Sequence, residues 1–288
     1  MSRQVRIVIL NYNGETLLPL CLPSIVESAK TASSPVPITL LDNQSQDQGL
    51  DYVRRTFPEI KIETAPANKV LCSYNEYLPK IEEPVVILLN NDIRVEADFI
   101  DPLAERFLSD PGTFLAAPRV MSFDGRRVEA GRSKGRMRCG IFRCEARYPD
   151  YEKEALIPSE TFTSGFGAFS REKFLALGGY DERYLPGIME DVDLCLRARR
   201  AGYRLYYEPR SVVYHMGQAS FKKRFGPSKI AEMAHRNTFL FMWKNFSGPR
   251  FWISHLAFLP LRIFAALLRG RTAFAKGFLA ALRIQWKR

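Results

Sequence analysis

The residues of this sequence best suited to chemistry are three acids that lie within four positions of one another. Glu190, Asp191 and Asp193 open a stretch with helical spacing that Gly202 ends. A carboxylate within hydrogen-bond reach of a hydroxyl can remove its proton, which is general base catalysis. A solvated helix cap explains the acids equally well, because the helix dipole favours acids in a first turn. The acids alone do not decide between the two.

A histidine follows the acids at the end of the next expected strand. Residues 203–207 are β-prone, and residues 212–214 lead directly to His215. A helix that begins with acids and a strand that ends in a histidine can direct both groups into one cleft. Imidazole is a common metal ligand, although a buried structural histidine would give the same pattern.

The N-terminal part of the chain predicts the fold that would position these groups. Residues 5–10 (VRIVIL) and 84–89 (PVVILL) are apolar runs typical of strands buried on both faces, and residues 38–41 and 60–63 predict two shorter strands. Stretches compatible with helices lie between them. This β-α-β-α-β-α-β order predicts an α/β fold with a mostly parallel, doubly wound sheet and helices on both faces.

Polar residues collect after three of these four strands, where the carboxyl ends of a parallel sheet form the usual ligand rim. One aspartate after a strand is most often a helix cap or turn former. Three polar clusters along one rim favour a ligand site instead. The clusters are Asn11, Tyr12 and Asn13, then Asp42 and Asn43, and then Asn90, Asn91 and Asp92.

The middle of the chain, residues 116–150, carries nine basic residues among glycines and is expected to be less regular. Such a stretch is most often a mobile surface loop. It could also close over a polyanionic group such as a diphosphate, because guanidinium groups bind phosphates well. Both interpretations stay open.

Composition predicts a protein of ordinary globular character in a reducing compartment. Of the 288 residues, 46% are hydrophobic and 25% are charged, and the five cysteines are scattered without the spacing of a zinc site. The N-terminus runs straight into the first strand, so no signal peptide is expected. These features favour the cytoplasm.

The net charge of +11 is concentrated in the C-terminal tail, because no acid follows Glu232 while ten basic residues do. Residues 251–268 of this tail are mostly apolar and nearly long enough to span a membrane. His255, Pro260 and Arg262 interrupt them, which makes a span costly.

The end of the tail, residues 273–286, places aromatic residues along one side and basic residues on another. This pattern predicts attachment to the anionic inner face of the cytoplasmic membrane. The alternative is a pair of amphipathic helices that pack on the rest of the protein. No nucleic acid partner is expected, since the tryptophans stand in aliphatic surroundings.

Six stretches between residues 5 and 246 follow one another in a characteristic order: VRIVILNYNG, ITLLDNQSQDQG, NKVLCSYN, VVILLNNDIRVEADFIDPL, GGYDERYLPGIMEDVDLCLRARRAGYRLYYEPRSVVYHMG and HRNTFLFMWKNF. Together they resemble family 2 glycosyltransferases, which are inverting enzymes of the GT-A fold that use nucleotide-sugar donors. The similarity is to bacterial members, often rhamnosyltransferases, that build cell-surface polysaccharides. It implies a catalytic domain over residues 1–246, and residues 247–288 then form a basic amphipathic helical appendage.

On the donor side, the resemblance implies that the polar strand ends bind the nucleotide sugar. Asp42 would recognise the nucleotide base. Asp92 ends a motif that takes the place of the family's DxD, so it would bind a divalent metal, Mn²⁺ or Mg²⁺, on the diphosphate. The other residues expected to bind the donor are Asn11, Tyr12, Asn13, Asn68, Asn90 and Asn91.

On the acceptor side, the resemblance implies that Asp191 is the catalytic base for a hydroxyl of a lipid-linked or polysaccharide acceptor. Glu190 is the alternative base. His215 would join Asp92 at the metal. A divalent metal on the phosphates would stabilise the leaving nucleoside diphosphate.

Two positions depart from the family pattern. Asn90 stands where many relatives carry aspartate, so the metal motif has one carboxylate, and Val70 stands where glycine is usual and could reshape the donor pocket. Two other functions stay open. A sugar nucleotidyltransferase is one, although residues 11–14 lack its Gly-rich phosphate loop. The other is a membrane-bound scaffold that binds sugar nucleotides without turnover.

Overall fold

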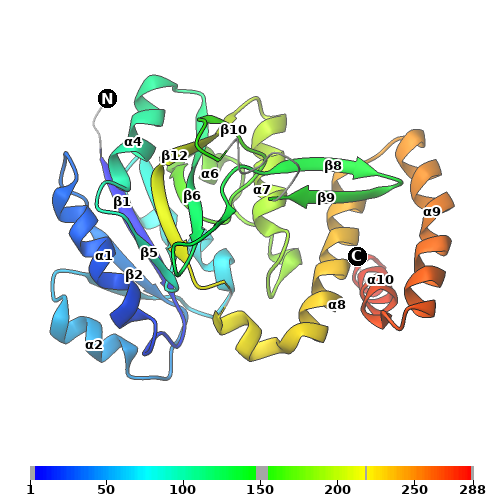
Figure 1. The fold of residues 1–288 in the computed structure, drawn as a ribbon, viewed down its shortest axis with the longest axis horizontal. Coiled ribbons are helices and arrows are strands. Elements are labelled where there is room, and N and C mark those ends of the chain that lie inside the picture. Colours follow the sequence, from blue (N-terminus) through cyan, green and yellow to red (C-terminus); the bar gives the residue numbers. More distant parts are fainter. Residues whose placement is uncertain (1–3, 147–154, 218, 287–288) are drawn as a thin grey trace.

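The computed structural model describes residues 4–146, 155–217 and 219–286. Its centre is a sheet with the strand order β3-β2-β1-β4-β11-β6-β12-β10, covered by helices on both faces (Figure 1). The strands are β1 (Val5–Asn11), β2 (Ile38–Asp42), β3 (Lys61–Thr64), β4 (Val85–Asn90), β5 (Ile93–Val95), β6 (Thr113–Ser122), β7 (Val128–Ala130), β8 (Lys134–Arg138), β9 (Ile141–Glu145), β10 (Ser159–Glu160), β11 (Gly167–Ser170) and β12 (Arg204–His215).

In the N-terminal half, helices alternate with strands along the chain. The last three helices, α8, α9 and α10, follow one another and lie together beside the sheet (Figure 1). They are α1 (Leu18–Thr31), α2 (Gly49–Thr56), α3 (Tyr74–Tyr77), α4 (Ile100–Ser109), α6 (Arg171–Ala176), α7 (Glu190–Arg200), α8 (Ala219–Asn245), α9 (Pro249–Leu268) and α10 (Thr272–Gln285). Short 3-10 turns are η1 (Val70–Ser73), η2 (Leu78–Lys80) and η3 (Glu182–Tyr184).

The prediction of a mostly parallel α/β sheet is confirmed. β1 pairs in parallel with β2 and β4, and β2 pairs in parallel with β3. In this register Asn11 lies opposite Asp42, and Leu10 lies opposite Asn90. The polar ends of three strands are therefore level at one edge of the sheet.

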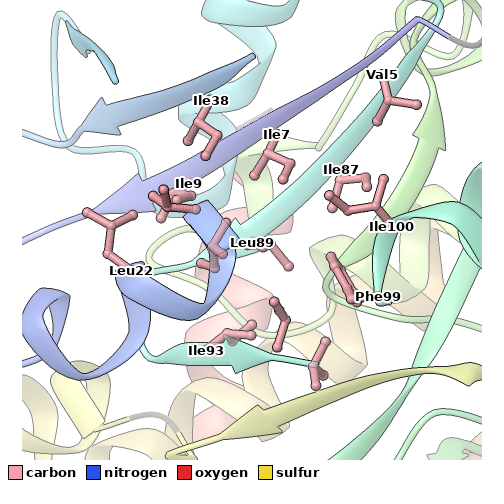
Figure 2. Close-up of a cluster of buried hydrophobic side chains, with 14 of the residues drawn as sticks. Val5, Ile7, Ile9, Leu22, Ile38, Ile87, Leu89, Ile93, Phe99 and Ile100 are labelled. Atoms are coloured by element: carbon pink, nitrogen blue, oxygen red, sulfur yellow. The ribbon is translucent and has the colours of Figure 1, made fainter. Parts of the chain in front are cut away.

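Both faces of β1 are buried, which explains its mostly apolar sequence. Val5, Ile7 and Ile9 point into a core shared with α1 and α4 (Figure 2). Val8 and Leu10 point to the opposite core, shared with α3 and α7. Arg6 is the exception near the start of the strand, where it donates to Thr39 and Glu83. Because side chains alternate along a strand, a strand with helices on both sides is apolar at most positions.

The middle of the chain is more regular than expected. β6 occupies its start, and β8 and β9 form an antiparallel hairpin that leaves the sheet and reaches toward α9 (Figure 1). The expectation of an irregular segment is therefore wrong up to residue 146, while residues 147–150 lie outside the described residues. Ile141 and Phe142 fix the hairpin by packing against α8, so its exposed arginines do not prevent strand pairing.

The C-terminal helices share a core with β9 and the start of α7. Phe239 and Phe241 of α8 pack with Leu259 of α9 and Ala281 of α10. The predicted boundary between residues 246 and 247 falls in the turn between α8 and α9. Since the end of α8 packs with α9 and α10, the division into a catalytic domain and an appendage stays a prediction.

Candidate active site

A cavity of about 760 Å³ opens at the carboxyl ends of β1 and β4, beside the start of α7. Polar strand ends form one wall, and the acid pair of α7 lies on another. The predicted site residues that line it are Asn11, Tyr12, Asn68, Asn90, Asn91, Asp92, Glu190, Asp191 and His215.

Asn11 connects the polar ends of three strands. Its Nδ2 donates to Asp42 Oδ1 at 2.9 Å, and its Oδ1 accepts from Asn91 Nδ2 at 2.8 Å. The side chain is fully buried, so both ends of its amide are paired within the protein. β1 lies between β2 and β4, which is why its last residue can reach both neighbours.

Asp42, the residue expected to recognise the base, lies behind Asn11 and does not line the cavity. Its Oδ1 also accepts from Ser45 Oγ at 2.5 Å, and its Oδ2 accepts from Ser45 N at 2.9 Å. The adjacent Asn43 lines the cavity instead, and its buried Oδ1 has no hydrogen-bond partner among the described residues.

Asn13 lies outside the main cavity too. Its side chain is exposed, and its Oδ1 accepts from Gln46 N at 2.9 Å. It lines a separate polar depression of about 300 Å³ with Glu15, Thr16, Gln46 and Asp47. The structure therefore separates Asn13 from the other predicted donor-binding residues.

Asp92 and His215 meet because β5 pairs antiparallel with the end of β12. Ile93 lies opposite His215, and Met216 N donates to the Asp92 carbonyl at 3.1 Å. Asp92 Oδ2 is 3.5 Å from His215 Nε2, while the buried Asp92 Oδ1 has no hydrogen-bond partner among the described residues.

These two side chains fit a divalent metal that is shared with a substrate. Among the described residues, no group of three or more histidines, cysteines and acids could hold a metal by itself. Mg²⁺ is usually bound by one or two carboxylates, with substrate phosphates and water as the other ligands. An imidazole beside a carboxylate suits Mn²⁺ as well. Asp92 and His215 therefore match a site completed by a diphosphate.

Glu190 and Asp191 begin α7 and face the cavity. Glu190 is only 6% exposed, and its Oε2 has no hydrogen-bond partner among the described residues. Asp191 is more exposed, with Thr163 Oγ1 3.5 Å from its Oδ2. Burial raises the pKa of both carboxyl groups, and the charge of Asp191 raises the pKa of Glu190 further. A carboxylate with a raised pKa is a better base near neutral pH.

The third acid, Asp193, turns away from the cavity and anchors the helix. It is fully buried and accepts hydrogen bonds of 2.7 to 2.9 Å from Tyr184, Arg197, Lys244 and Asn245. Burial opposes its ionisation, yet the bonds from Lys244, Asn245 and Arg197 hold its pKa below the usual range. Its role is structural.

Several cavity residues were not predicted from the sequence. Arg143 of β9 was noted only as one of the basic residues of the middle segment, and among the described side chains it is the one lysine or arginine that lines the cavity. The others are mostly apolar and come from β9, the turn before α7, and α8. They include Phe142, Ile188, Met189, Phe225 and Thr238. Nothing in their local sequence distinguishes them from core residues.

Val70 shows why glycine is usual at its position. It lines the cavity with a φ of 51°, which β-branched residues rarely adopt. Asn68 Oδ1 accepts from its N–H at 3.2 Å, and Asn43 Nδ2 donates to its carbonyl at 3.3 Å. These neighbours hold the left-handed backbone that glycine would adopt without strain.

Known proteins with the same fold are glycosyltransferases. GalNAc-T7 in complex with UDP, GalNAc and Mn²⁺ matches 82% of this chain with a TM-score of 0.62 and 17% identity, and this chain spans about half of that protein, 48%. The mannosyltransferase PcManGT from Pyrobaculum calidifontis, with GDP-Man and Mn²⁺, matches 99% of this chain and 88% of its own with a TM-score of 0.57 and 16% identity. The fold is therefore the GT-A fold.

The sequence comparison points to one kind of glycosyltransferase. The chain is 27% identical over 238 residues to the N-acetylglucosaminyl-diphospho-decaprenol L-rhamnosyltransferase of Mycobacterium tuberculosis. This match covers 74% of this chain and 76% of the relative. No protein-family model matches the chain. The predicted resemblance to bacterial rhamnosyltransferase-like enzymes is confirmed.

Proposed function

We propose that this protein is an inverting family 2 glycosyltransferase, which moves a sugar from a nucleotide-diphosphate donor to an acceptor hydroxyl. One observation carries the proposal. A single cavity joins a buried acid pair with raised pKa values to the Asp92–His215 pair and the polar strand ends. Base, metal ligands and donor-binding groups are the parts that this reaction requires.

The arrangement supports a direct displacement. Asn43 and Asn68 bind the nucleotide part of the donor, Asn11 positions Asn91 beside them, and Asp92 with His215 would hold the metal. The bound metal supplies positive charge to the diphosphate as it leaves. Asp191 takes the proton of the acceptor hydroxyl while its oxygen bonds to the anomeric carbon and the bond to the diphosphate breaks. Attack opposite the leaving group inverts the configuration at that carbon.

Asp191 is the better base of the acid pair on this geometry. Its carboxylate is more exposed to the cavity than that of Glu190, so an acceptor can reach it. Burial raises the pKa of Glu190, and the charge of Asp191 raises it further, so Glu190 is the member of the pair that holds its proton more tightly. The neighbouring wall, with Phe142, Ile188 and Phe225, suits an acceptor with an apolar part. The decaprenol-linked substrate in the relative's name supports a lipid-linked acceptor, and a polysaccharide is the alternative.

A thermal-shift experiment tests the donor proposal. We expect one of the uridine, guanosine or thymidine diphosphates, with Mn²⁺, to raise the Tm of the full chain by several degrees. Ligand at about 100 times Kd adds about 2.7 kcal/mol of stability, and each kcal/mol is worth about 2–4 °C at this size. The same nucleotide without metal should give a smaller shift.

The outcomes separate the three candidate functions. No shift with any nucleotide would contradict the proposal. A shift without release of nucleoside diphosphate from the matching sugar donor indicates the scaffold. Release of pyrophosphate from a nucleoside triphosphate and a sugar phosphate indicates a nucleotidyltransferase.

We further propose that α9 and α10 attach the protein to the inner face of the cytoplasmic membrane. α9 is 20 residues long, its most apolar 18-residue window has a mean hydropathy of 1.7, and only 6% of that window is buried. It is the one helix among the described residues that is long and apolar enough to cross a membrane. The apolar side chains of α9 that are more than half exposed are Ile253, Leu256, Leu261, Phe264, Leu267 and Leu268.

The opposite side of α9 supports a helix that lies on the membrane. His255 is buried, with its Nδ1 2.8 Å from the Gly140 carbonyl, and Trp243 Nε1 donates to its Nε2 at 3.2 Å. Arg262 Nη2 donates to the carbonyl of Arg138 at 3.3 Å. A spanning helix would break these contacts. Two of the three residues that interrupt the apolar sequence, His255 and Arg262, thus dock α9 on the protein, while Pro260 is exposed.

Substitutions on the exposed face of α9 test membrane attachment. The wild-type protein should sediment with vesicles of phosphatidylcholine containing 30% phosphatidylglycerol, and less so at high salt. Ile253→Glu with Leu256→Glu and Phe264→Glu should weaken binding at least about tenfold, since burying each such side chain is worth about 1.5–3 kcal/mol. Leu20→Glu, at an exposed leucine on α1, is the matched control. Unchanged sedimentation of the triple variant would contradict the proposal.

A further inference from the structure

The turn that leads into the acid pair has a strained backbone. Gly187, Ile188 and Met189 have φ values of 139°, 77° and 81°. For Ile188 and Met189 this left-handed conformation is sterically costly, and it persists only when surrounding contacts impose it. The turn sets the direction in which Glu190 and Asp191 enter the cavity.

A single side chain of α8 contacts the carbonyl groups of this turn. Asn237 Nδ2 lies 2.6 Å from the carbonyl oxygen of Tyr184, 2.7 Å from that of Gly187 and 2.8 Å from that of Ile188. Asn237 is fully buried. One amide group therefore joins the start of the segment to the residues just before the acid pair.

Arg236 orients this amide. Its Nε donates to Asn237 Oδ1 at 2.8 Å, and its Nη2 donates to the Leu185 carbonyl at 2.5 Å. A guanidinium group can only donate, so the oxygen of the amide must face Arg236 and the nitrogen must face the turn. Arg236 is half-buried, and this burial lowers the pKa of its guanidinium.

The same face of α8 also binds the segment after the acid pair. Lys244 Nζ lies 2.7 Å from Asp193 Oδ2 and 2.7 Å from Asp181 Oδ2, and Asn245 Nδ2 donates to Asp193 Oδ1 at 2.8 Å. Lys244 follows Asn237 by seven residues, which is two turns of helix. α8 thus holds the chain on both sides of Glu190 and Asp191.

We propose that Asn237, oriented by Arg236, is a positioning residue that fixes the acid pair in the cavity. The stretch HRNTFLFMWKNF, which contains Arg236 and Asn237, would then position the acid pair. α8 would belong to the active site as well as to the C-terminal helices. The consequence for turnover rests on the proposed function. The contact itself does not, and hydrogen exchange can test it separately.

Asn237→Asp is the sharpest variant, because aspartate has nearly the same size and keeps an oxygen for Arg236. It replaces the donor that faces three carbonyls with an acceptor. We expect amide exchange at residues 187–191 to rise at least about tenfold by local opening. We expect kcat to fall about 10- to 100-fold, since small misplacements of a reacting group have effects of that order. Nucleoside diphosphate affinity with Mn²⁺ should stay within about twofold, because the donor-binding residues lie elsewhere.

Two further variants separate positioning from general stability. Ser211→Ala removes a buried bond of 2.7 Å to the Phe99 carbonyl, and neither residue lines the cavity. It should lower Tm without changing kcat or exchange at residues 187–191. Arg236→Lys keeps the positive charge but removes the guanidinium group, so both the Nε bond to Asn237 and the Nη2 bond to the Leu185 carbonyl are lost. It should show the Asn237→Asp pattern more weakly, and it serves as the test if the aspartate variant does not fold.

The readouts also separate this proposal from the proposed function. Unchanged kcat and unchanged exchange in Asn237→Asp or Arg236→Lys would overturn the positioning role, whatever happens to Tm. A wild-type protein that binds no nucleotide would overturn the proposed function. In that case raised exchange at residues 187–191 in the variant would still support the contact.

Discussion

Asp191→Asn should lower kcat about 10³-fold while leaving the protein folded. Asparagine has the same shape as aspartate but cannot accept the proton of the acceptor hydroxyl, and general base catalysis is worth about 10²- to 10⁴-fold. Donor affinity should be unchanged, because Asp191 acts on the acceptor side. The measurement is kcat for sugar transfer, with Tm and nucleoside diphosphate binding as checks. Transfer at the wild-type rate by the folded variant would contradict the assignment.

The pH dependence of the wild-type rate should report the same group. The base must be ionised to act, so the rate falls as pH decreases through its pKa. Since burial raises the pKa of Asp191 and of Glu190, this loss should occur above the range of an ordinary aspartate, about 3.9. The residual activity of Asp191→Asn should lack this dependence.

Matched substitutions decide which acid is the base. Glu190→Gln should reduce kcat less than Asp191→Asn and should leave the acidic limb nearly unchanged, because burial and the charge of Asp191 raise the pKa of Glu190 to about 8, so Glu190 is already neutral where Asp191 titrates. Asp51→Asn, at an exposed site on α2, should have no effect. If Glu190→Gln proves the more damaging change, Glu190 is the base and Asp191 orients it.

Asp92→Ala should abolish the response to metal. It removes the one carboxylate of the proposed metal pair and leaves only His215. The Tm increase given by nucleoside diphosphate with Mn²⁺ should fall to the value without metal. kcat/KM should decrease about 100-fold or more, which corresponds to roughly 3 kcal/mol of lost transition-state stabilisation.

The structure also predicts how this variant behaves without ligands. Asp92 Oδ1 is buried and has no hydrogen-bond partner among the described residues. Its removal should therefore lower the free energy of unfolding only slightly. The Tm of the unliganded variant should stay within about 2 °C of wild type. Asp98→Asn, at an exposed site six residues later, is the control and should keep the metal response. A full Mn²⁺ response in Asp92→Ala would exclude Asp92 as a ligand.

Short-range patterns were sufficient to predict the parallel part of the sheet and most of the polar groups of the cavity. A continuous apolar run such as residues 5–10 is required when helices cover both faces of a strand, and the structure has this arrangement. Parallel strands place their carboxyl ends at one edge, so Asn11, Asn91 and Asp92 could be expected to meet. The start of α7 at Glu190 was also predictable from its spacing and acids.

Other features depend on contacts between remote segments, which carry no local signal. Strand direction is one of them, since β11 runs antiparallel between β4 and β6 without a distinctive sequence. The β8–β9 hairpin of the basic middle segment is another such feature. It is held by Ile141 and Phe142, which are buried against α8, a remote part of the chain.

By itself, the sequence determined the α/β fold, the polar rim and the acid pair, because these follow from periodicity and from the ends of single elements. Only the tertiary structure decided which polar groups are free to bind. Asn11 and Ser45 already bond the carboxylate of Asp42, whereas Asn43 and Asp92 each keep an oxygen that no described residue bonds. It also decided that α8 holds the turn before Glu190, since a hydrogen bond between residues 50 positions apart depends on how the whole chain packs.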